Sequence, residues 1–443
     1  MLHNYLTLAL KVLRRKPFYT FISLFGISFT LMILMVLTSL FDAGLGKNQP
    51  LTKRDYLVVS PYAERSRTEP DTMLVIDTLT LAGGEVRYDT TEEIAQNVVS
   101  NSIGPMSYRF IMDNLVDLES AERVAIYSDG DFTDGFIDGR KFTFSSYYTN
   151  ADYWRVLDFD FLYGAPFNEA DIEAAAQKVV LTDKAARIYF GELGPDLIGR
   201  EMALGRRTFT VAGIVSRPLA DSPMFGGDIY LPVTTADARA LASNEIDGGF
   251  SAIFEATSPR GRQAIKDEIE FISQNFQFPP ESDYNGLRVS SATVIEGYAM
   301  ATVQEQDPQK ALRVLFIPLS ILVLLFVALP LINLINLNVS RVFERRSEIG
   351  VRKAFGAEPR DILYQFIFEN LVITVIGGAI GLLLAILLIS YVNANDLLGI
   401  TRLSLSYQVV FYYLLVILLF GLLSGLLPAY RVSRTNVAAA LRG

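Results

Sequence analysis

Few side chains in this chain have the type and spacing that catalysis or metal binding requires. Cysteine is absent and His3 is the one histidine among 443 residues, which excludes a thiolate nucleophile, a histidine-based triad and a multi-histidine metal site. Asp129–Gly135 has the spacing of the start of a calcium loop. However, Asp134 stands at the position of the sharp-turn glycine and Arg140 at that of the bidentate glutamate. We interpret the stretch as an acidic turn and expect no metal site.

Phosphate chemistry is missing as well. The chain contains no G-x-x-x-x-G-K-[ST] loop, the motif whose backbone amides cradle the phosphates of ATP. The many acidic residues could include the carboxylate pair of a glycosidase, but no spacing selects two of them. We therefore expect that the chain has no catalytic residues, is not an enzyme and binds no cofactor itself. Work driven by ATP and Mg²⁺ must come from a partner.

The most distinctive polar stretch is residues 340–365, which is basic and contains two glycines that can end or bend a helix. Pro359 favours the start of a new helix directly after the second glycine. The pattern predicts a compact helix–turn–helix with a basic rim that binds a protein partner. The alternative is a solvated connector, held by ion pairs of Glu344 or Glu348 with neighbouring arginines.

Four apolar runs must position this stretch. Each is long enough to cross a bilayer, because about 20 helical residues span its hydrocarbon core of ~30 Å. The predicted transmembrane helices are 18–41, 314–339, 366–391 and 407–428. The first run is longer than the apolar core of a signal peptide and no small-residue cleavage site follows it, so we expect it to be retained. The expected fold class is an α-helical membrane protein with four transmembrane helices plus a large domain between the first and second.

The distribution of charge predicts the orientation of these helices. Residues 42–313 carry 42 acidic and 25 basic residues, whereas the rest of the chain has a balance of +8. Basic residues gather before the first helix, between the second and third, and after the fourth, which are cytoplasmic positions in membrane proteins. We expect segments 1–17, 340–365 (the coupling loop) and 429–443 inside, and 42–313 with the short loop 392–406 outside. The acidic bulk excludes a nucleic-acid binder.

Several positions predict packing against lipid or protein. Apolar residues at helical spacing in 1–17 predict an amphipathic helix on the inner membrane surface, or else a plain extension of the first helix. Small residues four apart let helix backbones approach closely, and the amides of two asparagines need protein partners in lipid. A polar transport path is the alternative for the asparagines. The predicted helix-packing residues are Gly377, Gly381, Gly421, Gly425, Asn333 and Asn336.

The outer segment 42–313 mixes helical and strand patterns. Alternating or short apolar runs predict strands, and apolar residues three and four apart predict helices. The clearest strands are Lys178–Thr182, Arg207–Val215 and Asp228–Pro232, with shorter pieces at 58–59 and 125–127; the clearest helices are Asp183–Phe190 and Gly261–Gln274. We expect an α+β domain of two lobes, with the middle lobe at about 130–250.

The sequence also resembles one known family. Glu348–Ala357, which reads EIGVRKAFGA, is similar to the E-I-G-x-R-K-A-x-G-A signature of MacB/FtsX-type ABC permeases. Leu427–Arg442 resembles the C-terminal pattern of that family, with Asn436-Val437 where Asn-Pro is usual. Asn150–Gly199 looks like its periplasmic core domain, with a looser pattern. The resemblance covers nearly the whole chain.

This resemblance implies a type VII, or mechanotransmission, permease of the bacterial inner membrane. Two permease copies, or one copy and a paralogue, would bind two copies of an ABC ATPase that uses ATP and Mg²⁺. In MacB itself the ATPase is fused ahead of the first helix; here 17 residues precede that helix, so a separate ATPase subunit is expected. The residues expected to dock on it are Glu344, Arg345, Arg346, Glu348, Ile349, Gly350, Arg352, Lys353, Ala354, Phe355, Gly356 and Ala357.

The implied task is efflux with a periplasmic adaptor and an outer-membrane channel, or transport of envelope lipoproteins or another substrate. An FtsX-like regulator of cell-wall hydrolases that transports nothing is the first alternative, although such chains tend to have a much smaller outer domain. A membrane-anchored binding or sensor protein without an ATPase is the second. The substrate itself has no signature in the sequence.

Overall fold

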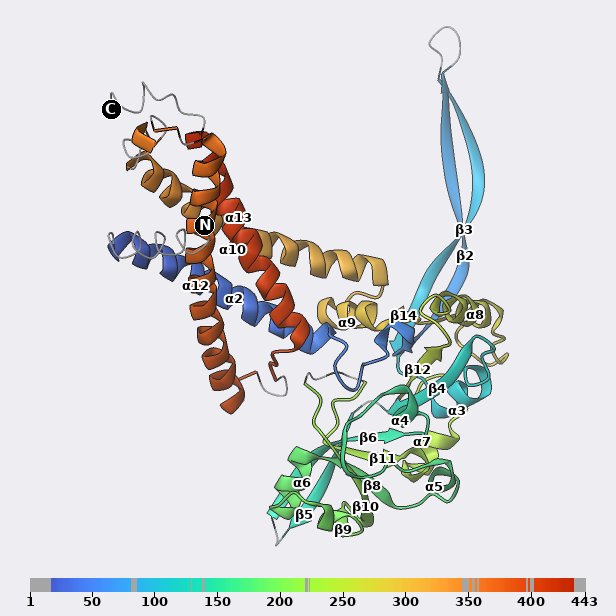
Figure 1. Cartoon of the computed structure of the whole chain (residues 1–443). Coiled ribbons are helices and arrows are strands. Elements are labelled where there is room, and N and C mark those ends of the chain that lie inside the picture. The colour runs from blue at the N-terminus through green and yellow to red at the C-terminus, as the bar shows by residue number, and fades with distance from the viewer. Residues whose placement is uncertain are drawn as a thin grey trace. The chain divides into compact units, whose positions relative to one another are not determined.

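The structure is a computed structural model that describes residues 17–80, 86–128, 130–137, 140–219, 222, 224–344, 350–352, 355–356, 358–395, 397–398 and 402–433. The chain divides into two compact units (Figure 1). One is helical and consists of residues up to Gly46 and from Arg313 onward; the other, Lys47–Leu312, is an α+β domain. Apolar helices therefore flank a large domain inserted after the first of them, which confirms the predicted fold class.

The helical unit contains four apolar helices, α2 (Pro17–Leu45), α10 (Pro308–Glu344), α12 (Pro359–Ala394) and α13 (Tyr407–Ser433). Among the described residues, Thr20–Leu45, Pro308–Ala328 and Arg360–Ala394 are long and apolar enough to cross a membrane, and Tyr407–Leu423 is a shorter apolar stretch. Helices α2, α12 and α13 share a buried core that includes Ile27, Leu31, Ile373, Tyr413 and Phe420. In α10, by contrast, only 6% of the apolar stretch is buried.

The α+β unit is built from short elements around one large sheet. Its strands are β1 (Leu57–Ser60), β2 (Ala63–Thr80), β3 (Val86–Gly104), β4 (Ala121–Ser128), β5 (Asp131–Ile137), β6 (Arg140–Thr149), β7 (Phe161–Gly164), β8 (Lys178–Thr182), β9 (Glu201–Leu204), β10 (Arg207–Val215), β11 (Ile229–Pro232), β12 (Phe250–Ala256), β13 (Gly286–Val289) and β14 (Ala292–Thr293). Its helices are η1 (Arg54–Tyr56), α3 (Tyr108–Asn114), α4 (Tyr153–Val156), α5 (Glu169–Glu173), α6 (Asp183–Phe190), η2 (Pro195–Leu197), η3 (Val233–Thr235), α7 (Ala238–Ala242), α8 (Arg262–Asn275) and α9 (Val294–Val303).

Eleven strands form the large sheet, in the order β11-β8-β10-β9-β5-β6-β4-β12-β1-β14 with β7 on β10. Strand β11 pairs with β8 on one side and runs parallel to β6 on the other, which closes six strands into a ring. The ring encloses a buried core that includes Phe144, Leu181, Val211, Ile214 and Leu231. The strands of this ring all come from Asp131–Pro232.

The local elements predicted most clearly are confirmed. Strands β8 and β10 and helix α6 have the predicted bounds, and β11 and α8 differ from the prediction by one residue at one or both ends. Thr182 caps α6 by accepting a hydrogen bond from the backbone amide of Ala185, and Gly191 ends the helix in the left-handed conformation. Local patterns were sufficient here because the caps lie within the same few residues as the apolar run.

Strands β2 and β3 form a long two-stranded ribbon that the sequence analysis does not predict (Figure 1). They have 18 and 19 residues and pair along their whole described length. A third strand, β13, pairs with β2 only from Ala63 to Ser66, at the base of the ribbon. Among the described strands, both backbone edges of the ribbon beyond this base are therefore unpaired.

Trp154, the one tryptophan of the chain, lies in an aromatic cluster of the α+β unit. Its ring packs edge to face on Phe159, Phe161, Phe167 and Tyr230, with centroids 5.3–5.5 Å apart. The residue is only 9% exposed. Since no other tryptophan competes, its fluorescence reports the packing of this unit in the full-length chain.

Candidate functional site

The predicted ATPase-docking residues occupy the connection between α10 and α12; we call residues 344–357 the docking segment. Helix α10 ends at Glu344, and Gly350–Arg352 are helical. Phe355 and Gly356 form a turn in which Gly356 has φ +91°, the left-handed region that favours glycine. The other predicted docking residues lie outside the described residues: Arg345, Arg346, Glu348, Ile349, Lys353, Ala354 and Ala357.

Phe355 is the most exposed aromatic side chain of the docking segment, at 88%. Val351, one helical turn before it, is also exposed, and the amide of Phe355 donates to the Val351 carbonyl at 3.1 Å. Exposed apolar side chains beside basic ones are typical of surfaces that bind protein. Val351 and Phe355 thus form an exposed apolar pair, and charged residues are their neighbours in the sequence.

Helix α12 begins at Pro359, as the sequence predicts. Glu358 is its N-cap and forms a capping box with Asp361, and Arg360 forms an ion pair with Glu358 at 2.5 Å. These two reciprocal hydrogen bonds fix where helix α12 starts.

Polar side chains that the sequence analysis missed lie on α12 just after this start. Gln365, Glu369, Asn370 and Thr374 are buried, although they belong to a helix apolar enough to cross a membrane. Arg352 Nη1 donates to Gln365 Oε1 at 2.6 Å, and Gln365 Nε2 donates to Glu369 Oε1 at 2.8 Å. The signal that could have found them is the presence of ionisable and amide residues at four-residue spacing in an apolar run.

The predicted helix-packing glycines lie where helices touch. A Cβ on Gly377 would lie 2.6 Å from Ile27 of α2, and one on Gly421 would lie 2.9 Å from Leu371 of α12. A Cβ on Gly381 would lie 2.7 Å from the Ser28 carbonyl oxygen. The hydroxyl of Tyr413 donates to the Gly378 carbonyl at 2.6 Å. Close backbone approach, together with interhelical hydrogen bonds such as this one, therefore holds α2, α12 and α13 together.

The remaining predicted packing residues lie on α10 and α13. Asn333 lies on α10 and Gly425 on α13, and Asn336 is exposed on the surface of α10. The predicted amphipathic helix 1–17 lies, apart from Pro17, outside the described residues, as do the last ten residues of the tail 429–443.

Replacing Gly381 with alanine is expected to cost about 1–3 kcal/mol of stability, because the new methyl group would overlap backbone of α2 that cannot rotate away. Thermal unfolding of the full-length chain in detergent, followed by circular dichroism, measures the effect. Gly26→Ala on α2 is the matched control, since a Cβ there meets nothing within 4 Å. Equal midpoints for the two variants would contradict the close approach of α2 and α12.

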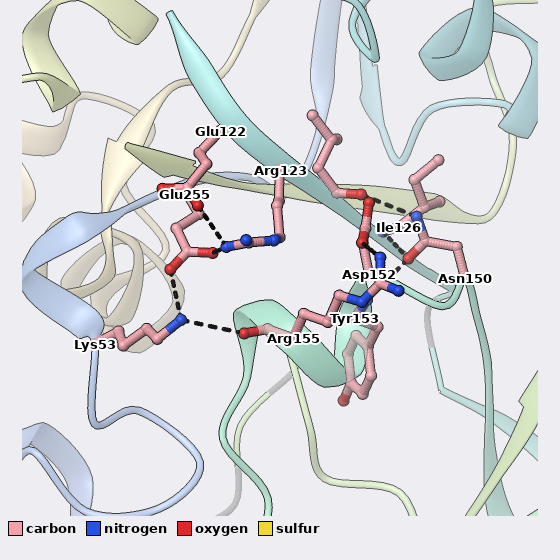
Figure 2. Close-up of polar contacts among 10 residues, drawn as sticks. Lys53, Glu122, Arg123, Ile126, Asn150, Asp152, Tyr153, Arg155 and Glu255 are labelled. Carbon is pink, nitrogen blue, oxygen red and sulfur yellow. Dashed lines mark hydrogen bonds and ion pairs between the residues drawn. The ribbon is translucent and has the colours of Figure 1, made fainter. Parts of the chain in front are cut away.

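In the α+β unit, a buried carboxylate lies in a cluster of charged groups (Figure 2). Glu255 on β12 is 4% exposed, and it accepts hydrogen bonds from Lys53 Nζ at 2.7 Å and Arg123 Nη1 at 2.9 Å. The hydrogen bond that Arg123 donates to Glu255 raises the pKa of Arg123. Lys53 Nζ also donates to the Arg155 carbonyl at 3.3 Å. The cluster ties the chain ahead of β1 to strands β4 and β12 and to α4.

The acidic turn of the sequence analysis lies mostly on β5. Asp129 lies outside the described residues, whereas Asp134 forms an ion pair with Lys141 at 2.8 Å and accepts from Thr143 at 2.9 Å. Both contacts lower the pKa of Asp134. Over the described part of the chain, no group of three or more His, Cys, Asp or Glu side chains is placed to hold a metal ion.

Two hollows open on the α+β unit. The larger, about 380 Å³, lies beside α8 and β13 and is lined by Tyr62, Glu270 and Arg288 among others. Arg288 pairs with Glu64 at 2.6 Å. The smaller, about 280 Å³, is lined by residues such as Gln49 and Phe159.

Comparison with known families agrees with this geometry. The family described as MacB-like periplasmic core domain matches residues 20–272, and the family described as FtsX-like permease C-terminal matches residues 320–437. The second match includes the docking segment. The first covers more than half of the chain, which is sufficient to assign the family.

Similar proteins include the macrolide export ATP-binding/permease protein MacB of Bdellovibrio bacteriovorus, 30% identical over 63% of this chain and 41% of that protein. The pyoverdine export ATP-binding/permease protein PvdT of Pseudomonas entomophila is 26% identical over 65% of this chain and 40% of its own length. The crystal structure of the periplasmic region of MacB from Actinobacillus actinomycetemcomitans matches 46% of this chain and 84% of that one, with 14% identity and a TM-score of 0.33.

The chain spans about two fifths of the length of these curated relatives. The matched parts are the permease helices and the periplasmic domain. The protein is a membrane protein with a periplasmic domain, and it belongs to the MacB/FtsX-type ABC permeases, with a MacB-like periplasmic core domain followed by an FtsX-like permease domain.

Proposed function

We propose that this chain is the permease subunit of an ATP-driven ABC complex. In this complex, hydrolysis of ATP by a separate ABC ATPase moves the periplasmic domain of the permease, which is mechanotransmission. The observation that carries the proposal is the docking segment: it lies inside the FtsX-like match and exposes Phe355 beside basic residues. The relatives MacB and PvdT bear the name ATP-binding/permease protein, which supports an ATPase partner.

The proposed location is the bacterial inner membrane. Both termini and the docking segment lie in the cytoplasm, where the ATPase with its ATP and Mg²⁺ would bind; this follows from the basic residues around the helices. Two ATPase copies would serve two permease copies, or one permease and a paralogue. The exposed apolar stretch of α10 is one surface available for lipid or for the second permease.

The proposed task is export or envelope transport, because the named relatives are exporters of macrolides and of pyoverdine. Substrate would be handled on the periplasmic side, with an adaptor and outer-membrane channel or with a lipoprotein as the next partner. The helices need not form a pore for this, because the work is done by a shift between two packings of the same helices.

The docking role predicts the effect of reversing charge in the docking segment. Arg352→Glu together with Lys353→Glu is expected to reduce the amount of ABC ATPase that co-purifies with the tagged full-length chain by roughly tenfold or more, because cations and anions at an interface select its partner. Mass spectrometry identifies and quantifies the ATPase in mild detergent with nucleotide present. Its hydrolysis rate, with and without the permease, is the second readout.

Arg402→Glu is the matched control, because Arg402 is exposed and lies in the loop predicted on the outer side. It should leave both readouts unchanged. Full ATPase recovery and full stimulation in the doubly reversed variant would refute docking through this segment. Absence of any P-loop ATPase from preparations of the unaltered chain would refute the ABC assignment of function and favour a sensor.

A further inference from the structure

The buried polar side chains of α12 form two rows. Gln365 and Glu369 are one helical turn apart, and Asn370 and Thr374 form a second row of the same spacing. All four are at most 8% exposed. Glu369 lies about 15 Å along the helix from Pro359, given a rise of about 1.5 Å per residue. Burying a carboxylate this far along a membrane-spanning helix costs free energy, and such residues usually mark functional sites.

The first row connects to the docking segment. The Gln365 amide accepts from the Arg352 guanidinium at 2.6 Å and donates to the Glu369 carboxylate at 2.8 Å. Its two polar ends are thus oriented by a cation on one side and by an anion on the other. Hydrogen bonds in such a chain polarise and strengthen one another. The result is a directed polar link from Arg352 into the helix bundle.

In the second row, Asn370 connects α12 to α13, whereas the bond of Thr374 stays within α12. Asn370 Nδ2 donates to the Gly421 carbonyl of α13 at 2.7 Å, and the Thr374 hydroxyl donates to the Asn370 carbonyl at 2.9 Å. Gly421 lies against α12, so the bond crosses a close helix contact. Asn370 follows Glu369 directly in the helix. A displacement of Glu369 therefore also moves Asn370, the residue that bonds α13.

From these contacts we infer that Gln365 and Glu369 are positioning residues that carry movement of the docking segment, through Arg352, to the α12–α13 pair. Leucine or methionine at these positions would fill the same space without the cost of burying polar groups, but would not hold a guanidinium at a fixed place. The inference rests on the proposed function, since it gives the docked ATPase a path to the helices.

Such a link acts in both directions. If ATPase binding favours one position of Arg352, the link favours the matching packing of α12 on α13, and the packing of the helices shifts ATPase binding by the same factor. Breaking the link should therefore leave the ATPase able to bind but remove most of the permease's effect on its turnover. A residue that only packed the helices would not separate binding from turnover in this way.

The first test measures turnover in the full-length chain, reconstituted with its co-purified ATPase in lipid nanodiscs. Gln365→Met keeps side-chain length but breaks the link, and permease-dependent stimulation of ATP hydrolysis is expected to fall about tenfold. ATPase bound per permease is expected to stay within about twofold. Glu369→Met breaks the link from its other end and should match, which covers the case in which one variant fails to fold. Thr374→Val, whose lost bond is internal to α12, is the control and should change neither.

The second test needs no ATPase. The chain contains no cysteine, so Phe355→Cys provides a single site for a spin label in the docking segment. Loss of the Arg352–Gln365 hydrogen bond in Gln365→Met should increase the mobility of the label in the electron paramagnetic resonance spectrum. The same label with Thr374→Val should keep the mobility of the parent.

The outcomes separate the two proposals. Higher mobility with unchanged stimulation would show that the link holds Arg352 but carries no movement to the helices, and would overturn the inference. Unchanged mobility in Gln365→Met would show that Arg352 is not held through Gln365, and would overturn it as well. An unaltered chain that stimulates no ATPase would overturn the proposed function instead, and the mobility measurement would still decide whether the link exists.

Discussion

Alanine in place of Gly164 is expected to lower the free energy of unfolding of the α+β unit by about 3–5 kcal/mol. Gly164 has φ +69°, and a left-handed backbone costs a residue with a side chain roughly 1–2 kcal/mol. A Cβ there would also lie 2.3 Å from the Ala212 carbonyl oxygen and 2.8 Å from Ile198 Cδ1. Overpacking of this kind typically costs about 1–3 kcal/mol, and the backbone contact leaves little room to relax.

Urea unfolding of the full-length chain in mild detergent, followed by Trp154 fluorescence, measures this effect. The ring of Trp154 lies 5.5 Å from that of Phe161, and Phe161 is on β7, the strand that ends at Gly164. Gly205→Ala separates the two causes, because Gly205 has φ +58° but its Cβ would meet nothing within 4 Å. That control should show only the roughly 1–2 kcal/mol of the backbone. If both variants lose the same stability, β7 does not approach β10 as closely as described.

Removing both cations from Glu255, by Lys53→Met with Arg123→Met, is expected to cost about 3–5 kcal/mol, because it leaves a buried carboxylate without its partners. Glu255→Gln should cost less, about 1–2 kcal/mol. The reason is asymmetry of burial: the side chains of Lys53 and Arg123 are 42% and 34% exposed and can reach water, whereas Glu255 cannot.

Urea unfolding followed by Trp154 fluorescence also measures these two variants, and a third variant completes the comparison. Adding Glu255→Met to the two cation replacements removes the stranded charge and should recover most of the lost stability, since apolar groups can replace a buried ion pair at little cost. A triple variant as unstable as the double one would show that Lys53 and Arg123 act through packing of their stems. A Glu255→Gln variant less stable than the double replacement would reverse the assigned asymmetry.

The sequence predicts best the features that depend on neighbouring residues. Lys178–Thr182 and Asp183–Phe190 combine an apolar run, a threonine cap and a closing glycine within fourteen residues, so strand and helix follow from the local pattern. Likewise Pro359 after a glycine predicts the start of α12, because proline lacks only an amide that the first turn does not use. The four apolar helices follow from length and hydropathy alone.

Features that depend on distant partners were not predictable in this way. Closure of the ring requires β11 to pair with β6, about 80 residues earlier, and nothing in Ile229–Pro232 specifies that neighbour. In the sequence, Glu255 cannot be distinguished from the many other acidic residues. Only the fold brings Arg123 of β4 and Lys53, ahead of β1, beside it. Glu369 was overlooked for the same reason: its meaning comes from Gln365 and Arg352, and only the fold shows that they form a chain.

The β2–β3 ribbon has a consequence for how this domain can change in size. Beyond Ser66, no described strand other than β2 and β3 takes part in the ribbon, so its length can change independently of the large sheet. At about 3.3 Å per residue, strands of 18 and 19 residues extend roughly 60 Å. Inserting or deleting two residues in each strand would move the tip by about 7 Å while preserving the alternation of faces along the ladder. Homologous chains can thus differ in reach without any change in their core.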